Sequence, residues 1–273
     1  MSRDLDSIVN SSGFMLQIAI EHAVENSSSR HEFNVHAREH PWRFDGDSGF
    51  IDLVLGRSSA RLVCECKRSR GGAWVFLVED DARDLDRGRL HWRKMAARRL
   101  ASSGWHNFHF TTSAPESSFC IVRGHGENQR PMLETIAARL IVSTEALAAE
   151  EAPFLDTAED GDNFRFYVPL LITTAELWIC RYKPDSIALA TGDAAGANYE
   201  QVPLVYFRKS LTTGPADYSL RGTERELPDR AFASMSREQE RTVVVVSAEY
   251  LVDLLLRWET AVTRDARGFP WAS

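Results

Sequence analysis

The chain has 273 residues, of which 44% are hydrophobic and 26% are charged, a composition typical of a globular protein with a sizeable core. Its formal net charge of -7 argues against a protein that coats nucleic acid nonspecifically, since such proteins are usually basic. A protein that contacts nucleic acid only along a locally basic path remains compatible with this charge.

The first ten residues contain no apolar signal core, and the apolar run near Leu251 is interrupted by Glu249 and Asp253. We therefore expect no membrane span and a cytoplasmic location. Cys64 and Cys66 lie two residues apart, too close along one strand to bridge easily, which suggests free thiols in a reducing compartment.

The first predicted element is a helix over residues 11–26, capped by Ser11 or Ser12. Gln17, Glu21 and Glu25 recur every four residues and therefore share one helical face. Taken alone, this pattern predicts a solvated helical face.

A polar turn at residues 27–29 and a half-exposed strand over residues 31–44 follow. The strand carries His31, His36 and His40, so zinc ligation together with Cys64 or Cys66 is an alternative. It is disfavoured because no CxxC pair is present, although His36 and His40 form an HxxxH pair.

The most informative stretch runs from residue 49 to residue 67, GFIDLVLGRSSARLVCECK. Two apolar, β-branched runs flank a short polar break, which predicts an antiparallel hairpin. If Ser58 and Ser59 are the two loop residues, Asp52 lies directly opposite Glu65. Strand alternation then puts Lys67 on the face of Glu65, and Cys64 and Cys66 on the other face.

Two opposed carboxylates destabilise a sheet unless something offsets their repulsion. A divalent cation would do so, since Mg²⁺ is typically held by one or two carboxylates plus water and phosphate oxygens. The alternative is that Asp52 and Glu65 are solvated residues on an exposed face. The apolar neighbours of both residues argue for a strand buried on two sides, and a longer loop would separate the carboxylates.

An Asp, a short hairpin, and Glu-X-Lys on an apolar strand, all preceded by a helix that bears Glu, resemble the PD-(D/E)XK nuclease superfamily, which has the restriction-endonuclease-like fold. Ile51 stands where the family name has Pro, and Glu65 occupies the D/E position. The resemblance is clearest over residues 13–67. Beyond Lys67 it depends on element order alone.

The resemblance implies an α/β (α+β) fold with an α-β-β-β-α-β core, a mixed central sheet and flanking helices. Residues 1–182 would form this core, with an insertion at about residues 69–126. Residues 183–273 would form a C-terminal strand and helix extension packed on it.

The resemblance also implies the site and its chemistry. Asp52, Glu65 and Glu21, helped by the Cys66 carbonyl, would hold Mg²⁺, for which Mn²⁺ would substitute, and Lys67 would orient the attacking water. Gln17 and Glu25 are the fallbacks for Glu21. DNA is the implied partner, and analogy with restriction enzymes suggests a homodimer.

Basic residues supply a candidate nucleic-acid path. Arg68 and Arg70 flank a turn beside the proposed site, and a strand is expected at residues 74–78. The segment 80–100 changes from acidic to basic, which favours a helix that follows phosphates, with Trp92 or Trp105 stacking on a base. The alternative is a solvated helix. The candidate phosphate contacts in this segment are Arg89, Arg93 and Lys94.

Three predicted features complete the core. A helix runs from about residue 128 to residue 150 and is stopped by Pro153; we assign it packing but no chemistry. Residues 164–181 form two strands joined near residues 173–176.

The last third contains exposed turns at residues 183–198 and a strand at residues 202–207. This strand ends in Arg208 and Lys209, which are either further phosphate contacts or charges that protect a strand edge. After an irregular region, a strand at residues 242–246 leads to a helix capped by Ser247.

We therefore expect a Mg²⁺-dependent deoxyribonuclease, an endonuclease, acting in defence against foreign DNA or in repair. The alternative from another class is a catalytically silent module that has the same fold and binds nucleic acid or a protein. A zinc-dependent hydrolase built on the histidines is a third hypothesis.

Overall fold

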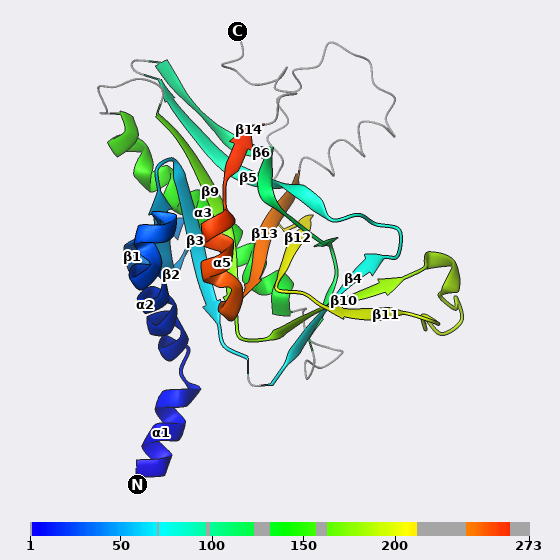
Figure 1. Cartoon of the computed structure of the whole chain (residues 1–273). Helices are drawn as coiled ribbons and strands as arrows, with labels where there is room; N and C mark the ends of the chain where they lie inside the picture. The colour runs from blue at the N-terminus through cyan, green and yellow to red at the C-terminus, as the bar shows by residue number, and fades with distance from the viewer. Residues whose placement is uncertain are drawn as a thin grey trace, which may run out of the picture.

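The computed structural model describes residues 2–69, 71–96, 99–122, 132–156, 163–211 and 239–262. Ten strands in this part of the chain form one mixed sheet, and four form a second sheet (Figure 1). Among the described residues, no helix combines the length and the apolar character needed to cross a membrane.

The main sheet runs β1-β2-β3-β9-β13-β12-β7, and β5, β6 and β14 branch from β9. Its strands are β1 (Asn34–Phe44), β2 (Asp47–Arg57), β3 (Ala60–Lys67), β9 (Asn163–Thr173), β13 (Glu240–Ser247), β12 (Leu204–Ser210), β7 (Glu116–Ser117), β5 (Leu85–Ala96), β6 (Arg99–Ala114) and β14 (Thr260–Val262). The three strands β3, β9 and β13 are parallel neighbours, so their carboxyl ends meet at one edge of the sheet.

The smaller sheet has the order β11-β10-β4-β8. Its strands are β11 (Asn198–Gln201), β10 (Glu176–Tyr182), β4 (Ala73–Glu79) and β8 (Cys120–Val122). Thr174 and Ala175 lie between β9 and β10, as predicted, so the chain passes there from the main sheet to the smaller one.

The helices are α1 (Ser2–Ser11), α2 (Phe14–His31), α3 (Met132–Asp156) and α5 (Leu251–Arg257), with short 3-10 turns η1 (Pro184–Ser186) and η2 (Ala248–Tyr250). Figure 1 shows α2 and α5 on the near face of the main sheet. Leu16, Ile20 and Val24 of α2 share a core with Leu62 and the other buried side chains of that face. Side chains of α3 pack with the opposite face and with the smaller sheet. The result is a mixed α+β architecture.

The predicted helix over residues 80–100 is wrong, because this segment forms β5 and part of β6. Leu90 and Trp92 alternate with Arg89 and His91, so both faces of a strand are buried. Gly88 permits this packing, since a Cβ there would lie 2.7 Å from Phe110 Cζ. The order of charges along the segment favoured a helix, but pairing with β6 and β9 outweighs local preference.

Smaller corrections concern helix ends. Residues 27–29 belong to α2 and form no turn, and Gly13 occupies the N-cap position without a side-chain cap. Pro153 lies inside α3, which continues to Asp156. Ser247 precedes η2 and also makes no side-chain cap bond. The predicted start of the helix at residue 128 and most of the irregular region 212–241 fall outside the described residues.

Candidate active site at the end of the second hairpin

The hairpin formed by β2 and β3 has the predicted register. Arg57 pairs with Ala60 around the two-residue loop, and the ladder continues to Leu53 and Cys64. The ladder ends at this pair; continued by one residue, the same register would set Asp52 across from Glu65. The backbone N–H of Cys66 donates to Asp52 Oδ2 at 2.6 Å, so the aspartate side chain takes over a hydrogen bond at the point where the ladder ends.

The two strands present Asp52, Glu65 and Lys67 on one face. Val63 shares a core with α3, whereas Cys64 and Cys66 share a core with α2. Strand alternation therefore directs Glu65 and Lys67 toward the α3 side. The four cysteines of the chain are free thiols. The hairpin thus places two carboxylates and an ammonium group together, as predicted.

Both carboxylates have raised pKa values. Burial is the main cause for Asp52, and the charge of Glu39 adds to it, while the Cys66 N–H, Lys67 and Arg139 oppose the rise. Burial and then the charge of Asp52 raise the pKa of Glu65 to about 7. The carboxylates therefore repel one another, and the local positive charges compensate only in part.

Glu39 is a nearby acidic residue that the sequence analysis missed. Arg38 pairs with Leu53 and His40 pairs with Ile51, so Glu39 falls at the position across from Asp52. Its φ of 47° is left-handed and marks an irregularity in β1. The Asp45-Gly46 turn between β1 and β2 is a strong hairpin signal, and it would have indicated this proximity.

Arg139 is the second missed residue. It lies on α3, to which we assigned only packing, and its charge lowers the pKa values of both Asp52 and Glu65. A Cβ on Gly49 would come within 2.4 Å of its Nη2, so the glycine makes room for the guanidinium group. No pattern in the sequence distinguishes this arginine from others on a helix surface.

The first helix contributes a different residue from the one predicted. Glu21 forms an ion pair with Arg38 of β1 and Glu25 is exposed. Gln17 is buried, and its Nε2 donates to the backbone carbonyl of Asp52 at 2.9 Å. The fallback Gln17 is therefore the residue of α2 that contacts the site.

The predicted phosphate contacts are mostly engaged elsewhere. Arg208 pairs with Glu240 at 2.7 Å and Lys209 pairs with Glu134 at 2.9 Å. Arg89 is buried on β5, and Arg93 Nη1 donates to the Ala148 carbonyl at 3.5 Å. Arg70 and the side chain of Lys94 lie outside the described residues.

Arg68, which directly follows Lys67, differs from these residues in its hydrogen bonding. Its Nη1 is buried and has no hydrogen-bond partner among the described residues. A buried donor without a partner is costly, so an anionic ligand there would be stabilised.

The aromatic and histidine alternatives are not assembled into a site. Trp92 is buried and stacks on Phe164 at 5.7 Å, and Trp105 donates to Glu145. His31 contacts Ser27, while His40 pairs with Glu150. Over the part of the chain that the structure describes, no three His, Cys, Asp or Glu side chains form a group able to hold a metal ion.

Comparison with known proteins gives no family assignment: no protein-family model, curated protein or solved structure matches the chain. The functional argument therefore rests on the site itself.

Proposed function

We propose that the protein is a Mg²⁺-dependent nuclease that hydrolyses phosphodiester bonds of DNA. The observation that carries the proposal is the junction of β2 and β3, where Asp52 and Glu65 oppose one another beside Lys67. A strained pair of buried carboxylates next to a lysine suits a reaction on a phosphate that needs a cation.

The donor set fits Mg²⁺ in one particular way. Asp52 and Glu65 supply hard oxygen ligands, and the Cys66 carbonyl is a further candidate. Mg²⁺ commonly takes only one or two carboxylates and completes its shell with water and substrate phosphate, so a group of three acidic side chains is not required. Bound there, the ion would supply a Lewis acid that polarises the phosphate and acidifies water.

The chain's own residues have separate tasks in this proposal. The ammonium group of Lys67 orients the attacking water and offsets the negative charge that develops on the phosphoryl oxygens. Arg68 supplies a positive charge next to Lys67 for a phosphate of the strand. Gln17 positions the Asp52 backbone through its hydrogen bond.

The order of the elements supports the same proposal. The sequence α2, β1, β2, β3, α3, β9 follows the α-β-β-β-α-β order of the PD-(D/E)XK superfamily, with β4 to β8 inserted before α3. The strands β1, β2 and β3 are antiparallel neighbours, and β9 is parallel to β3. The similarity in order is an argument for the proposed fold family and for the nuclease activity.

The direct test is to incubate the protein with supercoiled, linear and single-stranded DNA and with RNA, with Mg²⁺, Mn²⁺ or EDTA. We expect DNA products with either ion, none in EDTA, and none from Asp52→Ala. The exposed Glu25 provides the matched control, Glu25→Ala, which should cleave like the wild type. Wild-type cleavage by Asp52→Ala would refute the proposal.

A catalytically silent module that binds nucleic acid is the second candidate. The observation in its favour is that Glu21, the carboxylate predicted as the third metal ligand, is paired with Arg38. This candidate predicts tight DNA binding that is indifferent to EDTA and yields no products over hours.

A further inference from the structure

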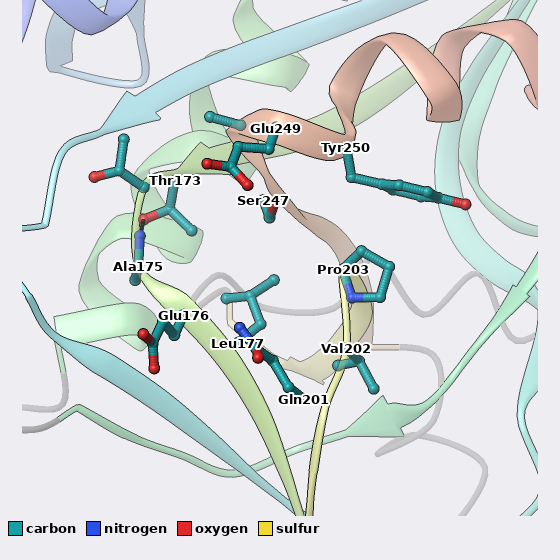
Figure 2. Close-up of a pocket in the computed structure, with 12 residues that line it drawn as sticks. Thr173, Ala175, Glu176, Leu177, Gln201, Val202, Pro203, Ser247, Glu249 and Tyr250 are labelled. Atoms are coloured by element: carbon teal, nitrogen blue, oxygen red, sulfur yellow. Dashed lines mark hydrogen bonds between the residues drawn. The ribbon is translucent and has the colours of Figure 1, made fainter.

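A pocket of about 670 Å³ lies where β9 ends and β10 begins. Its walls come from segments distant in sequence: the β9–β10 connection, the residues before β12, and the Ser247–Tyr250 segment that contains η2 (Figure 2). The pocket therefore lies beyond the carboxyl ends of the parallel strands β9 and β13. In open parallel sheets, the edge beyond the carboxyl ends of the strands is a preferred place for ligands.

The pocket adjoins the proposed catalytic lysine. Thr173, which lines it, is the β9 partner of Lys67 in the parallel pairing with β3. Thr174 N–H donates to the Lys67 carbonyl at 3.3 Å, and Thr174 Oγ1 accepts from Ser69 N–H at 2.9 Å. Neighbouring strands lie roughly 4.8 Å apart, so the wall of the pocket is one strand away from Lys67.

The lining has the chemistry of a site for a group that donates hydrogen bonds and carries no negative charge. Leu177, Val202 and Pro203 are apolar, whereas Ser247 and Glu249 supply oxygen atoms. Figure 2 shows the Glu249 carboxylate beside Ser247 at one edge of the pocket. The described residues that line the pocket include no lysine or arginine, so a phosphate would find no compensating charge there.

Two carboxylates line the pocket, but they are not equivalent. Glu176 Oε2 already accepts a hydrogen bond from Trp178 Nε1 at 3.1 Å. Glu249 is exposed at the pocket edge and is the better placed acceptor for a ligand. A carboxylate accepts well from an exocyclic amino group, as it does from the N4 amino group of cytosine.

We propose that this pocket holds one unstacked nucleobase of the nucleic-acid strand whose phosphate lies at Lys67, and that it prefers a base with an exocyclic amino group. This inference depends on the proposed function for the position of the strand. A base outside the stack can use apolar walls for its faces and oxygen atoms for its edge. Among DNA bases only thymine lacks the amino group, so the pocket discriminates against it.

Mononucleotides test the pocket without any cleavage. Saturation-transfer NMR on the full chain with dCMP and with dTMP should show transfer to the base protons, with a roughly tenfold preference for dCMP. Glu249→Ala should reduce the preference to about twofold, because it removes the acceptor. Val202→Trp should abolish transfer to both by filling the pocket. Leu189→Trp, at a fully exposed position that does not line the pocket, is the matched control and should bind like the wild type.

Absence of transfer in the wild type, or transfer that Val202→Trp leaves unchanged, would overturn the inference. Glu249→Ala changes an exposed side chain and keeps the test valid if Val202→Trp does not fold. The cleavage assay separates the two proposals. DNA cleavage without mononucleotide binding would refute the base-binding pocket and support the nuclease proposal. Mononucleotide binding without DNA cleavage would refute the nuclease proposal.

Discussion

The two ends of β3 carry charged side chains on the same face of the sheet, but they solve the problem of buried charge differently. At the start of the strand, Arg61 and Tyr167 both donate to Glu151 of α3, at 3.1 and 2.8 Å. At the end of the strand, the like charges of Asp52 and Glu65 meet. The charges at the start of β3 compensate one another, and we call this the balanced end. The charges at the end of β3 do not, and we call this the unbalanced end.

The balanced end has the features of a structural cluster. Arg61 is buried, and its Nη1 also donates to the backbone carbonyls of Ser58 and Ala60. Arg61 and Glu151 therefore each have hydrogen-bond partners, as stability requires for charges in a buried position. Burial and the neighbouring Glu151 also raise the pKa of Tyr167, which keeps its hydroxyl group as a donor.

The unbalanced end has the features of a functional site. Asp52 and Glu65 have raised pKa values because they are buried together. Such an arrangement is unfavourable for folding and persists where a ligand or a reaction needs it. The difference between the ends teaches that the surplus of negative charge, and not the mere presence of ionisable groups, marks the candidate site.

The largest expected effect of a substitution at the unbalanced end is on activity. Lys67→Ala should lower the rate of DNA cleavage by about a thousandfold, because it removes the charge that offsets the phosphoryl oxygens. Gel assays on supercoiled DNA measure the rate, and urea unfolding should show a stability within about 1 kcal/mol of the wild type. A rate within about threefold of the wild type would mean that Lys67 has no catalytic task.

A substitution at the balanced end should lower the stability of the protein and leave its activity unchanged. Glu151→Ala leaves Arg61 buried without its partner, so the free energy of unfolding should fall by about 3 kcal/mol. Cleavage at a temperature where this variant stays folded should match the wild type. A large loss of activity with unchanged urea stability would show that the balanced cluster is itself functional.

Removing charge from the unbalanced end should stabilise the metal-free protein. The pKa of Glu65 rises from 4.5 to about 7 on folding, so this group favours the fold most below pH 4.5, and its contribution is lost as the pH rises toward 7. Glu65→Gln should therefore stabilise the protein in EDTA by about 2 kcal/mol at pH 8, after discounting for partial exposure, and by nearly nothing at pH 4.

Urea unfolding at the two pH values measures this difference, and Glu25→Gln on the exposed side of α2 is the control that should change neither value. The same Glu65→Gln variant should be inactive in cleavage. Equal stabilisation at both pH values would show that the effect is not the charge of Glu65.

The smallest expected effect distinguishes two residues of α2. Gln17→Met should lower cleavage by about tenfold and stability by about 1 kcal/mol, because the hydrogen bond to the Asp52 carbonyl is lost. Glu21→Gln should leave cleavage within about twofold, since Glu21 is paired with Arg38. The reverse order of effects, measured in the same gel assay, would restore Glu21 as the metal ligand that the resemblance implies.

The part of the site that could be predicted from the sequence is the part that one turn determines. The apolar runs and the short break at Ser58 and Ser59 specify a two-residue loop, and this loop sets which residues face each other. A register fixed at the loop extends along the strands, so the proximity of Asp52, Glu65 and Lys67 could be predicted from the sequence.

The residues that were missed come from other elements. Which face of α2 is buried depends on how the helix rests on the sheet, so Gln17 could not be separated from Glu21 by spacing alone. Arg139 lies more than seventy residues beyond Glu65 in the sequence, and placing Glu39 required the register of the hairpin formed by β1 and β2. The segment at residues 85–96 became a strand because β6 and β9 pair with it.

The sequence by itself determined the local chemistry of this protein: a hairpin that sets two acids against each other beside a lysine. Only the tertiary structure decided what surrounds them. Gln17 donates to the Asp52 carbonyl, the guanidinium group of Arg139 lies against Gly49, and Thr173 lines a neighbouring pocket. The physical reason is range. A two-residue turn acts on its immediate neighbours, whereas helix orientation and the pairing of distant strands follow from the burial of the whole core.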